Sequence, residues 1–300
     1  MAWRLHLSDR TIKRLDILTG TPTLLAAWTQ PNRVTFLDLQ NGSQREDRTL
    51  EMPKSEDRTT PAWSEFMGTL QASNGVCFPV VRAARTSILA TVDGKYRLYQ
   101  TAPSEVFLDV DGKEAKLESD GASFSALAMA HEAGLLAALD SEAKLHIYRQ
   151  HVRVGIFETG LQGDEEFTPA LTISHDGSVL ALTDSRSIVL MDAAGALRKR
   201  IELHYRLGAL VCSPDGKRFI VSDLDANVIR VYDADLVPTH QRFAVDLLAE
   251  AKKSQLFASS TMSSAALGPL AINNKGVLAF ALAGTICVTS LARMKANPKP

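Results

Sequence analysis

The chain has 300 residues, of which 45% are hydrophobic, enough to bury the core of one large domain or of two ordinary ones. Its 33 Lys and Arg residues nearly balance its 34 Asp and Glu residues, so no overall field draws the protein to nucleic acid or to an anionic membrane. Binding of either kind would need a local patch.

The N-terminal segment and the cysteines favour a cytoplasmic protein. Residues 1–18 intersperse charged side chains among the apolar ones and therefore have no signal-peptide core. No stretch of about 18 uncharged apolar residues occurs, so we expect no membrane span. Cys77, Cys212 and Cys287 are far apart and each lies in an apolar run, which predicts reduced thiols in the core.

In chain order, the first predicted element is a strand, WRLHL at 3–7, in which apolar and polar residues alternate. A repeated pattern follows. Its copies lie at 23–39 and 87–99 as half-repeats, at 126–149, 170–193 and 208–234 in fuller form, and at 270–291 in a degraded form. The middle copies recur at close to the period of about 40 to 45 residues that is typical of a four-stranded propeller blade.

Each copy predicts a β-meander: a strand, a tight turn, a second strand, a polar turn and a third strand. Glycines at 134, 177, 216 and 276 mark the first turn, where a positive φ favours a residue without Cβ. Apolar runs such as 135–139 predict strands covered on both faces, and the more polar segments 152–157, 197–203 and 240–245 predict outer strands.

We therefore predict an all-β fold: a single β-propeller over 1–300, built of four-stranded antiparallel blades. Six blades are favoured and seven stay open, with insertions at about 43–75 and 236–266. The chain after Leu291 is too short and too rich in proline to form the last outer strand. We expect segment 3–7 to pair with 286–291 instead, so that the N-terminal strand closes the ring.

The stretch SPDGKRFIVSD with VIRVYD, within 213–233, resembles the WD40 and YVTN-type repeats of β-propellers, and the likeness covers most of the chain. The Trp-Asp pair of the WD40 family appears only as Tyr232-Asp233, Met191-Asp192 and Leu37-Asp38. No Gly-His dipeptide precedes a repeat, so the buried tetrad of the family is not expected here. The resemblance implies a fold and no particular function.

A search for catalytic motifs finds neither a Gly-x-Ser-x-Gly elbow nor a phosphate-binding loop. His146 and His151 are an odd number of residues apart, which on a continuous strand points them to opposite faces and away from a shared metal. His131 and His175 hold equivalent turn positions in adjacent repeats, so repeat equivalence accounts for both without chemistry.

Two acidic patterns are interpreted as turns. Asp109, Asp111 and Glu114 superficially resemble a calcium loop but lack its remaining ligand spacing, which favours an acidic hairpin. A second set recurs after the second strand of successive repeats: Asp140, Asp184 and Asp223. Because aspartate side chains accept hydrogen bonds from nearby backbone amides, we expect turn chemistry rather than a carboxylate ring.

Three segments are candidates for partner binding. Trp63, Phe66 and Met67 follow a charged stretch and form either an exposed anchor or a core-facing outer strand. Arg198, Lys199 and Arg200, near His204 and Arg206, make the densest basic patch, which serves either solubility or binding to an acidic surface. Segment 243–257 predicts an amphipathic helix.

Together these patterns predict a non-enzymatic, cytoplasmic scaffold that binds other proteins as part of a larger assembly, with no catalytic residue, metal or cofactor. Nucleic acid is disfavoured as a partner because the chain is near neutral and aromatics do not interleave with its basic residues. Two alternatives stay open. One is a metal-assisted hydrolase or lactonase with its site at the central channel, and the other is a sensor that binds a small molecule or peptide at the channel mouth.

Overall fold

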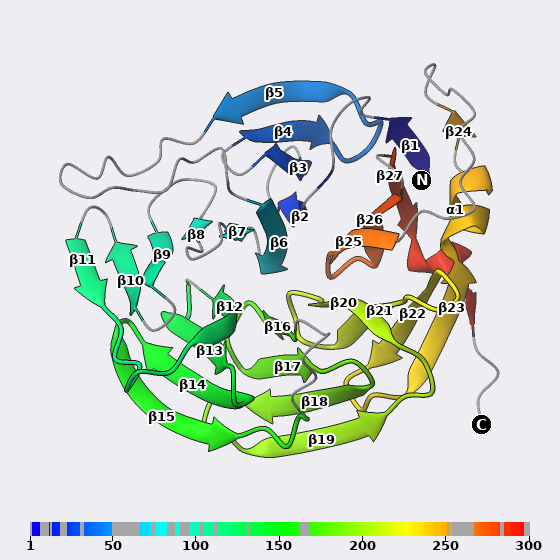
Figure 1. Ribbon diagram of the computed structural model, residues 1–300. Coiled ribbons are helices and arrows are strands. Elements are labelled where there is room, and N and C mark those ends of the chain that lie inside the picture. Colours follow the sequence, from blue (N-terminus) through cyan, green and yellow to red (C-terminus); the bar gives the residue numbers. More distant parts are fainter. Residues whose placement is uncertain are drawn as a thin grey trace.

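Antiparallel strands make up most of the regular structure, as the spacing of the turn signals predicts. The computed structural model (Figure 1) describes residues 2–6, 12, 14–18, 23–30, 33–49, 67–73, 76–82, 88–90, 96–102, 105–110, 113–130, 132–162, 169–250, 252–253, 267–282 and 285–296. Within these residues no helix is long and apolar enough to cross a membrane.

The strands form successive antiparallel meanders. Four of the sheets have four strands each. The first two consist of β2 (Arg14–Leu18), β3 (Leu24–Gln30), β4 (Arg33–Asp38) and β5 (Gln44–Thr49), and of β8 (Ile88–Ala90), β9 (Tyr96–Ala102), β10 (Glu105–Val110) and β11 (Lys113–Lys116). The other two consist of β12 (Phe124–Ala130), β13 (Leu135–Asp140), β14 (Lys144–Arg149) and β15 (Val152–Glu158), and of β16 (Ala170–Ile173), β17 (Val179–Thr183), β18 (Ser187–Asp192) and β19 (Leu197–Glu202).

Two further sheets have five strands, and one has two. The five-stranded sheets are β20 (Leu207–Cys212), β21 (Arg218–Asp223), β22 (Val228–Asp233), β23 (Pro238–Phe243) and β28 (Lys295–Ala296); and β25 (Leu267–Ile272), β26 (Val277–Leu282), β27 (Thr285–Ser290), β1 (Trp3–His6) and β24 (Lys252–Lys253). The two-stranded sheet pairs β6 (Met67–Ser73) with β7 (Val76–Arg82). The fold is thus the predicted all-β propeller, and the count of six blades stays a prediction.

The sheets stand around a common axis (Figure 1), and β6 and β7 lie between this axis and the sheet of β8–β11. Strands β12, β16, β20, β25 and β2 follow one another around the axis, and β6 contacts both β2 and β12. The core is divided into layers between neighbouring sheets. For example, Ile147 and Val189 share one layer, and Ile188 and Phe219 share the next. Both faces of the inner strands are therefore buried, which explains their continuous apolar runs.

The N-terminal strand closes the ring as predicted. Strand β1 pairs antiparallel with β27, with Trp3 opposite Val288 and His6 opposite Thr285. The Trp3 side chain is buried and its indole Nε1 donates a hydrogen bond of 2.8 Å to the carbonyl of Leu39 in the neighbouring sheet. The N-terminal strand thus completes the sheet of β25–β27, which comes from the C-terminal part of the chain.

The outer strands share a β-bulge at the same point of the repeat. The residues left without a partner in the register are Arg45 in β5, Val154 in β15, Arg198 in β19 and Thr239 in β23. Each bulge follows the turn that joins the outer strand to the third strand. A bulge bends the edge and increases its twist, which discourages unwanted strand pairing at the rim.

The second predicted insertion is only partly helical. The helix α1 spans Ala244–Glu250, shorter than the predicted 243–257, and buries Ala244 and Leu247 against the sheets of β20–β23 and β25–β27. The prediction was wrong for residues 252–253, which form β24 and pair in parallel with β1. The first predicted insertion, 43–75, contains β5 and β6, and its residues 50–66 and 74–75 lie outside the described part.

Candidate functional site

The recurring aspartates of the second turn are buried and act in turn chemistry, as predicted. One carboxylate oxygen of each accepts backbone N–H groups of its own turn: Asp140 from Glu142 and Lys144, Asp184 from Arg186 and Ser187, and Asp223 from Asp225 and Ala226. The second oxygen contacts a different side chain in each sheet: His146, Ser187 or Arg230. The three carboxylates are therefore occupied locally.

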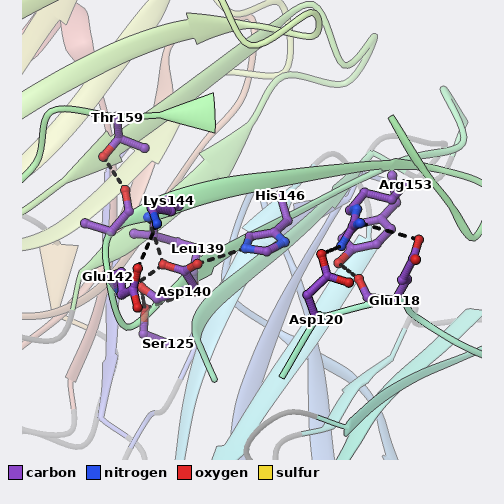
Figure 2. A network of polar contacts seen from close by, with 12 residues as sticks. Glu118, Asp120, Ser125, Leu139, Asp140, Glu142, Lys144, His146, Arg153 and Thr159 are labelled. Atoms are coloured by element: carbon purple, nitrogen blue, oxygen red, sulfur yellow. Dashed lines mark hydrogen bonds and ion pairs between the residues drawn. The ribbon is translucent and has the colours of Figure 1, made fainter. Parts of the chain in front are cut away.

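The contact between Asp140 and His146 is the most buried of these. Figure 2 shows the Asp140 carboxylate between its own turn and the imidazole, whose Nε2 lies 2.8 Å from Oδ2. The two side chains are 4% and 2% exposed, respectively. The Phe124 ring meets the imidazole edge-on at 5.0 Å, and Nδ1 of His146 is buried without a hydrogen-bond partner. The contact ties the end of β13 to β14.

Two further polar contacts join strands β14 and β15 to the segment before β12. Burial raises the pKa of the Tyr148 hydroxyl, which stays protonated and donates a hydrogen bond to the carbonyl of Glu118 at 2.6 Å. Beside it, Arg153 contacts Asp120 at 2.7 Å (Figure 2). These contacts hold the outer half of the sheet of β12–β15 against the chain that leaves β11.

The turns at one end of the propeller contact one another in sequence around the ring. His175 contacts Glu132 of the preceding sheet through its imidazole, and its backbone N–H donates to the carbonyl of Pro214 in the following sheet. The backbone N–H of Asp215 then donates to the side chain of Asn274. The equivalent turn positions thus join sheets to one another, which supports the non-catalytic interpretation of His175; His131 lies outside the described residues.

A cleft of about 890 Å³ lies between the sheets of β8–β11 and β12–β15. Its floor is apolar, formed by Leu108, Met129 and Leu136, and its rim is polar. The rim consists of the β11 end, the turn from β12 to β13 and the turn from β14 to β15. Sequence reasoning missed this cleft because its two walls come from different repeats.

The charges on the cleft rim are mostly unpaired within the described chain. Lys113, Glu114, Arg149 and His151 are exposed and form no ion pair there, whereas Glu132 is engaged with His175. Two permanent cations and a histidine thus face one free carboxylate. An apolar floor inside a rim with more basic than acidic side chains favours a ligand segment that combines apolar side chains with an acidic group.

The structure describes only part of the predicted partner-binding residues. Trp63 and Phe66 fall outside the described residues, and Met67 begins β6. Arg198 and Lys199 are exposed on the outer strand β19, at and next to its bulge. Arg200 is less exposed and is engaged with Glu202 and with the carbonyl of Gly160. Its basic neighbour Arg206 pairs with Asp225. Within the described residues, Arg198 and Lys199 form no ion pair.

The acidic segment that superficially resembles a calcium loop is a hairpin. Asp109 in β10 lies opposite Glu114 in β11, as expected for an antiparallel turn. Across the described residues, no three His, Cys, Asp or Glu side chains gather in a group able to hold a metal ion. Cys212 and Cys287 are buried free thiols, and burial raises the pKa of each to about 12.

Comparison with known proteins supports the propeller fold. No protein-family model matches the chain, and no curated protein does. The β-propeller domain of Cps50 (Swd1) from Myceliophteria thermophila matches with a TM-score of 0.64 at 11% identity, over 95% of this chain and 98% of that one. A chain of the crystal structure of the mitotic checkpoint complex matches at 0.62 and 11% identity, over 96% and 93%.

A streptogramin B lyase structure matches with a TM-score of 0.61 at 12% identity, over 99% of this chain and 98% of that one. Likenesses at such low identity concern the fold alone. They agree with the resemblance of the repeats to divergent WD40 and YVTN-type propellers, and they extend over nearly the whole chain.

Proposed function

We propose that the protein is a non-enzymatic, cytoplasmic propeller that binds other proteins and forms part of a larger assembly. The observation that carries the proposal is the cleft between the sheets of β8–β11 and β12–β15, in which an apolar floor lies inside a charged rim. This arrangement matches the anatomy of protein interfaces, where a desolvated apolar centre is surrounded by polar groups. One structural neighbour, a chain of the mitotic checkpoint complex, supports the use of this fold within an assembly.

The same proposal covers the organisation of the chain. We treat 1–300 as one propeller domain with insertions at about 43–75 and 236–266, and we keep Trp63, Phe66 and Met67 as a candidate anchor on the first of these. The buried free thiols Cys212 and Cys287 are consistent with a reducing compartment, where disulfides are rare.

The competing function is an enzyme with a metal-assisted site at the channel. The likeness to a streptogramin B lyase, which is named as an enzyme, favours it. Elemental analysis of protein purified from its host separates the two functions, since a stoichiometric metal would contradict the scaffold proposal.

A pull-down from the native host with paired variants tests the scaffold proposal and places its surface. In the cleft variant, Lys113→Glu with Arg149→Glu reverses the free cations of the rim, and we expect at least a ten-fold loss of the main partner. Lys217→Glu, an exposed lysine in the turn between β20 and β21, is the matched control and should retain the partner.

A third variant, Arg198→Glu with Lys199→Glu, tests the basic patch of β19. Loss of the partner in this variant alone would move the interface from the cleft to that outer strand. Failure of the wild-type protein to retain any stoichiometric partner would contradict the scaffold function itself.

A further inference from the structure

The outer strand β15 differs from the other outer strands in what it presents to solvent. Val152, Val154 and Ile156 are 65%, 49% and 41% exposed, respectively. By contrast, the exposed residues of β5 are Gln44, Arg45, Glu46 and Asp47, those of β11 are Lys113, Glu114 and Lys116, and those of β19 are Leu197, Arg198, Lys199 and Glu202. Charged side chains protect an edge from pairing, and β15 lacks this protection over its central residues.

The chain shows that the rim of this propeller accepts an added strand. Strand β28 pairs antiparallel with β23 at His240 and Gln241, directly after the bulge residue Thr239. Strand β24 similarly extends the sheet of β25–β27 by pairing with β1. The bulges of the outer strands therefore do not prevent strand addition.

Repeat equivalence places the corresponding acceptor position in β15. His240 lies opposite Val231, the residue before Tyr232, and Gly155 lies opposite Ile147, the residue before Tyr148. Gly155 and Ile156 thus correspond to the pair that β28 occupies in β23. In the other outer strands, the equivalent positions are Lys199 and Arg200 in β19 and Glu46 and Asp47 in β5, and all four residues are charged. In this set, the acceptor of β15 is uncharged, and none of the described strands pairs with its outer edge.

The charges at the two ends of β15 are self-complementary. Arg149 ends β14 and His151 lies in the turn before β15; both are exposed and form no ion pair within the described chain. Glu158 is exposed at the last position of β15. When two such strands run antiparallel, the basic end of each meets the acidic end of the other. Opposite charges in directly facing positions stabilise strand pairing.

We propose that two copies of this chain associate through antiparallel pairing of their β15 strands, across a two-fold axis close to Val154. This arrangement sets Val152 of one copy opposite Ile156 of the other and brings Glu158 of one copy to the end of the other strand where Arg149 and His151 lie. Such a contact is isologous, because each copy uses the same surface. One strand from each copy is buried, so the dimer belongs to the small, reversible class below about 1,200 Å².

Sedimentation velocity of the purified chain over a range of concentrations tests the pairing. We expect a reversible monomer–dimer equilibrium for the wild type. Val154→Arg should raise the dissociation constant about ten-fold or more, because it sets two like charges at the axis. Arginine fills the equivalent bulge in β5 and β19, so this variant is compatible with the local fold. Val237→Arg changes an exposed valine outside β15 and is the matched control, which should dimerise as the wild type does.

Disulfide trapping gives a second measurement that does not depend on the folding of the arginine variant. In a Cys77→Ser background, Val154→Cys should form an intermolecular disulfide under mild oxidation, and Val237→Cys should not. A wild type that stays monomeric at several hundred micromolar overturns the proposal. So does a dimer that persists in Val154→Arg, or a Val154→Cys chain that fails to crosslink. Because these experiments use one purified protein, their failure would leave the scaffold proposal untouched.

Discussion

Replacement of Trp3 tests the closure of the ring most directly, because this side chain joins the N-terminal strand to two sheets. Its ring is 6% exposed and packs with Leu15, Leu37 and Val288. It also lies over Gly42, where an added Cβ would come within 2.7 Å of the ring. The close approach requires glycine at this turn, whose φ of +75° favours the same residue.

The expected cost of Trp3→Ala follows from this burial. Truncation of a buried tryptophan costs about 3 to 5 kcal/mol, since it removes apolar contacts and leaves a cavity. The carbonyl of Leu39 also loses its donor, which is part of this cost. An unfolding entropy of about 2.1 cal/mol/K per residue means that a loss of about 4 kcal/mol lowers the midpoint of a 300-residue domain by roughly 6 °C.

Thermal unfolding followed by far-UV circular dichroism measures this shift. Trp3→Phe keeps most of the apolar volume and should recover much of the loss. Phe243→Ala is the control, because Phe243 is 52% exposed and its removal should change the midpoint little. Deletion of residues 1–8 removes β1 as a whole and should lower the midpoint further than Trp3→Ala. If Trp3→Ala and the deletion both unfold at the midpoint temperature of the wild type, the closure of the ring by β1 is wrong.

Two further predictions concern buried polar groups and thiols. Asp140→Ala leaves two backbone N–H groups of the turn and an imidazole without their acceptor, and should lower the free energy of unfolding by about 3 kcal/mol. Glu142→Ala is the control, because its side chain is 72% exposed, and should lower it by less than about 0.5 kcal/mol. Urea denaturation measures both. Burial raises the pKa of Cys212 and of Cys287 to about 12, so in a Cys77→Ser background the native protein should not react with a disulfide reagent between pH 7 and 9. Reaction of either thiol at the rate of an exposed cysteine while the protein stays folded would contradict this burial.

The cleft and the outer strand illustrate what the sequence could not provide. The exposed valines of β15 alternate with less exposed residues, a pattern that predicts an outer strand but does not say that nothing covers it. Likewise, Arg149 and Lys113 are 36 positions apart and belong to different repeats, and only the packing of two sheets brings them to one rim. No local pattern encodes such a juxtaposition.

The contact between Asp140 and His146 was predicted in part. Turn chemistry for the aspartate follows from its position after a strand, and the structure confirms it. The histidine on the second oxygen was missed, because the partner changes from sheet to sheet and the backbone pattern does not specify it. The helix over 243–257 was predicted too long, because periodicity does not register that β1 offers unpaired backbone groups to Lys252 and Lys253.

The sequence by itself determined the strands, the turns and the closure of the ring. These depend on local steric preferences and on a repeat that makes each unit bury its faces against copies of itself, as Gly177 and Gly216, both at positive φ, show at equivalent turns. The tertiary structure decided which outer edges are charged, covered or open, and where two sheets leave a cleft. Those features depend on contacts between residues far apart in the chain, whose energies are set by packing and solvent exposure rather than by the local pattern.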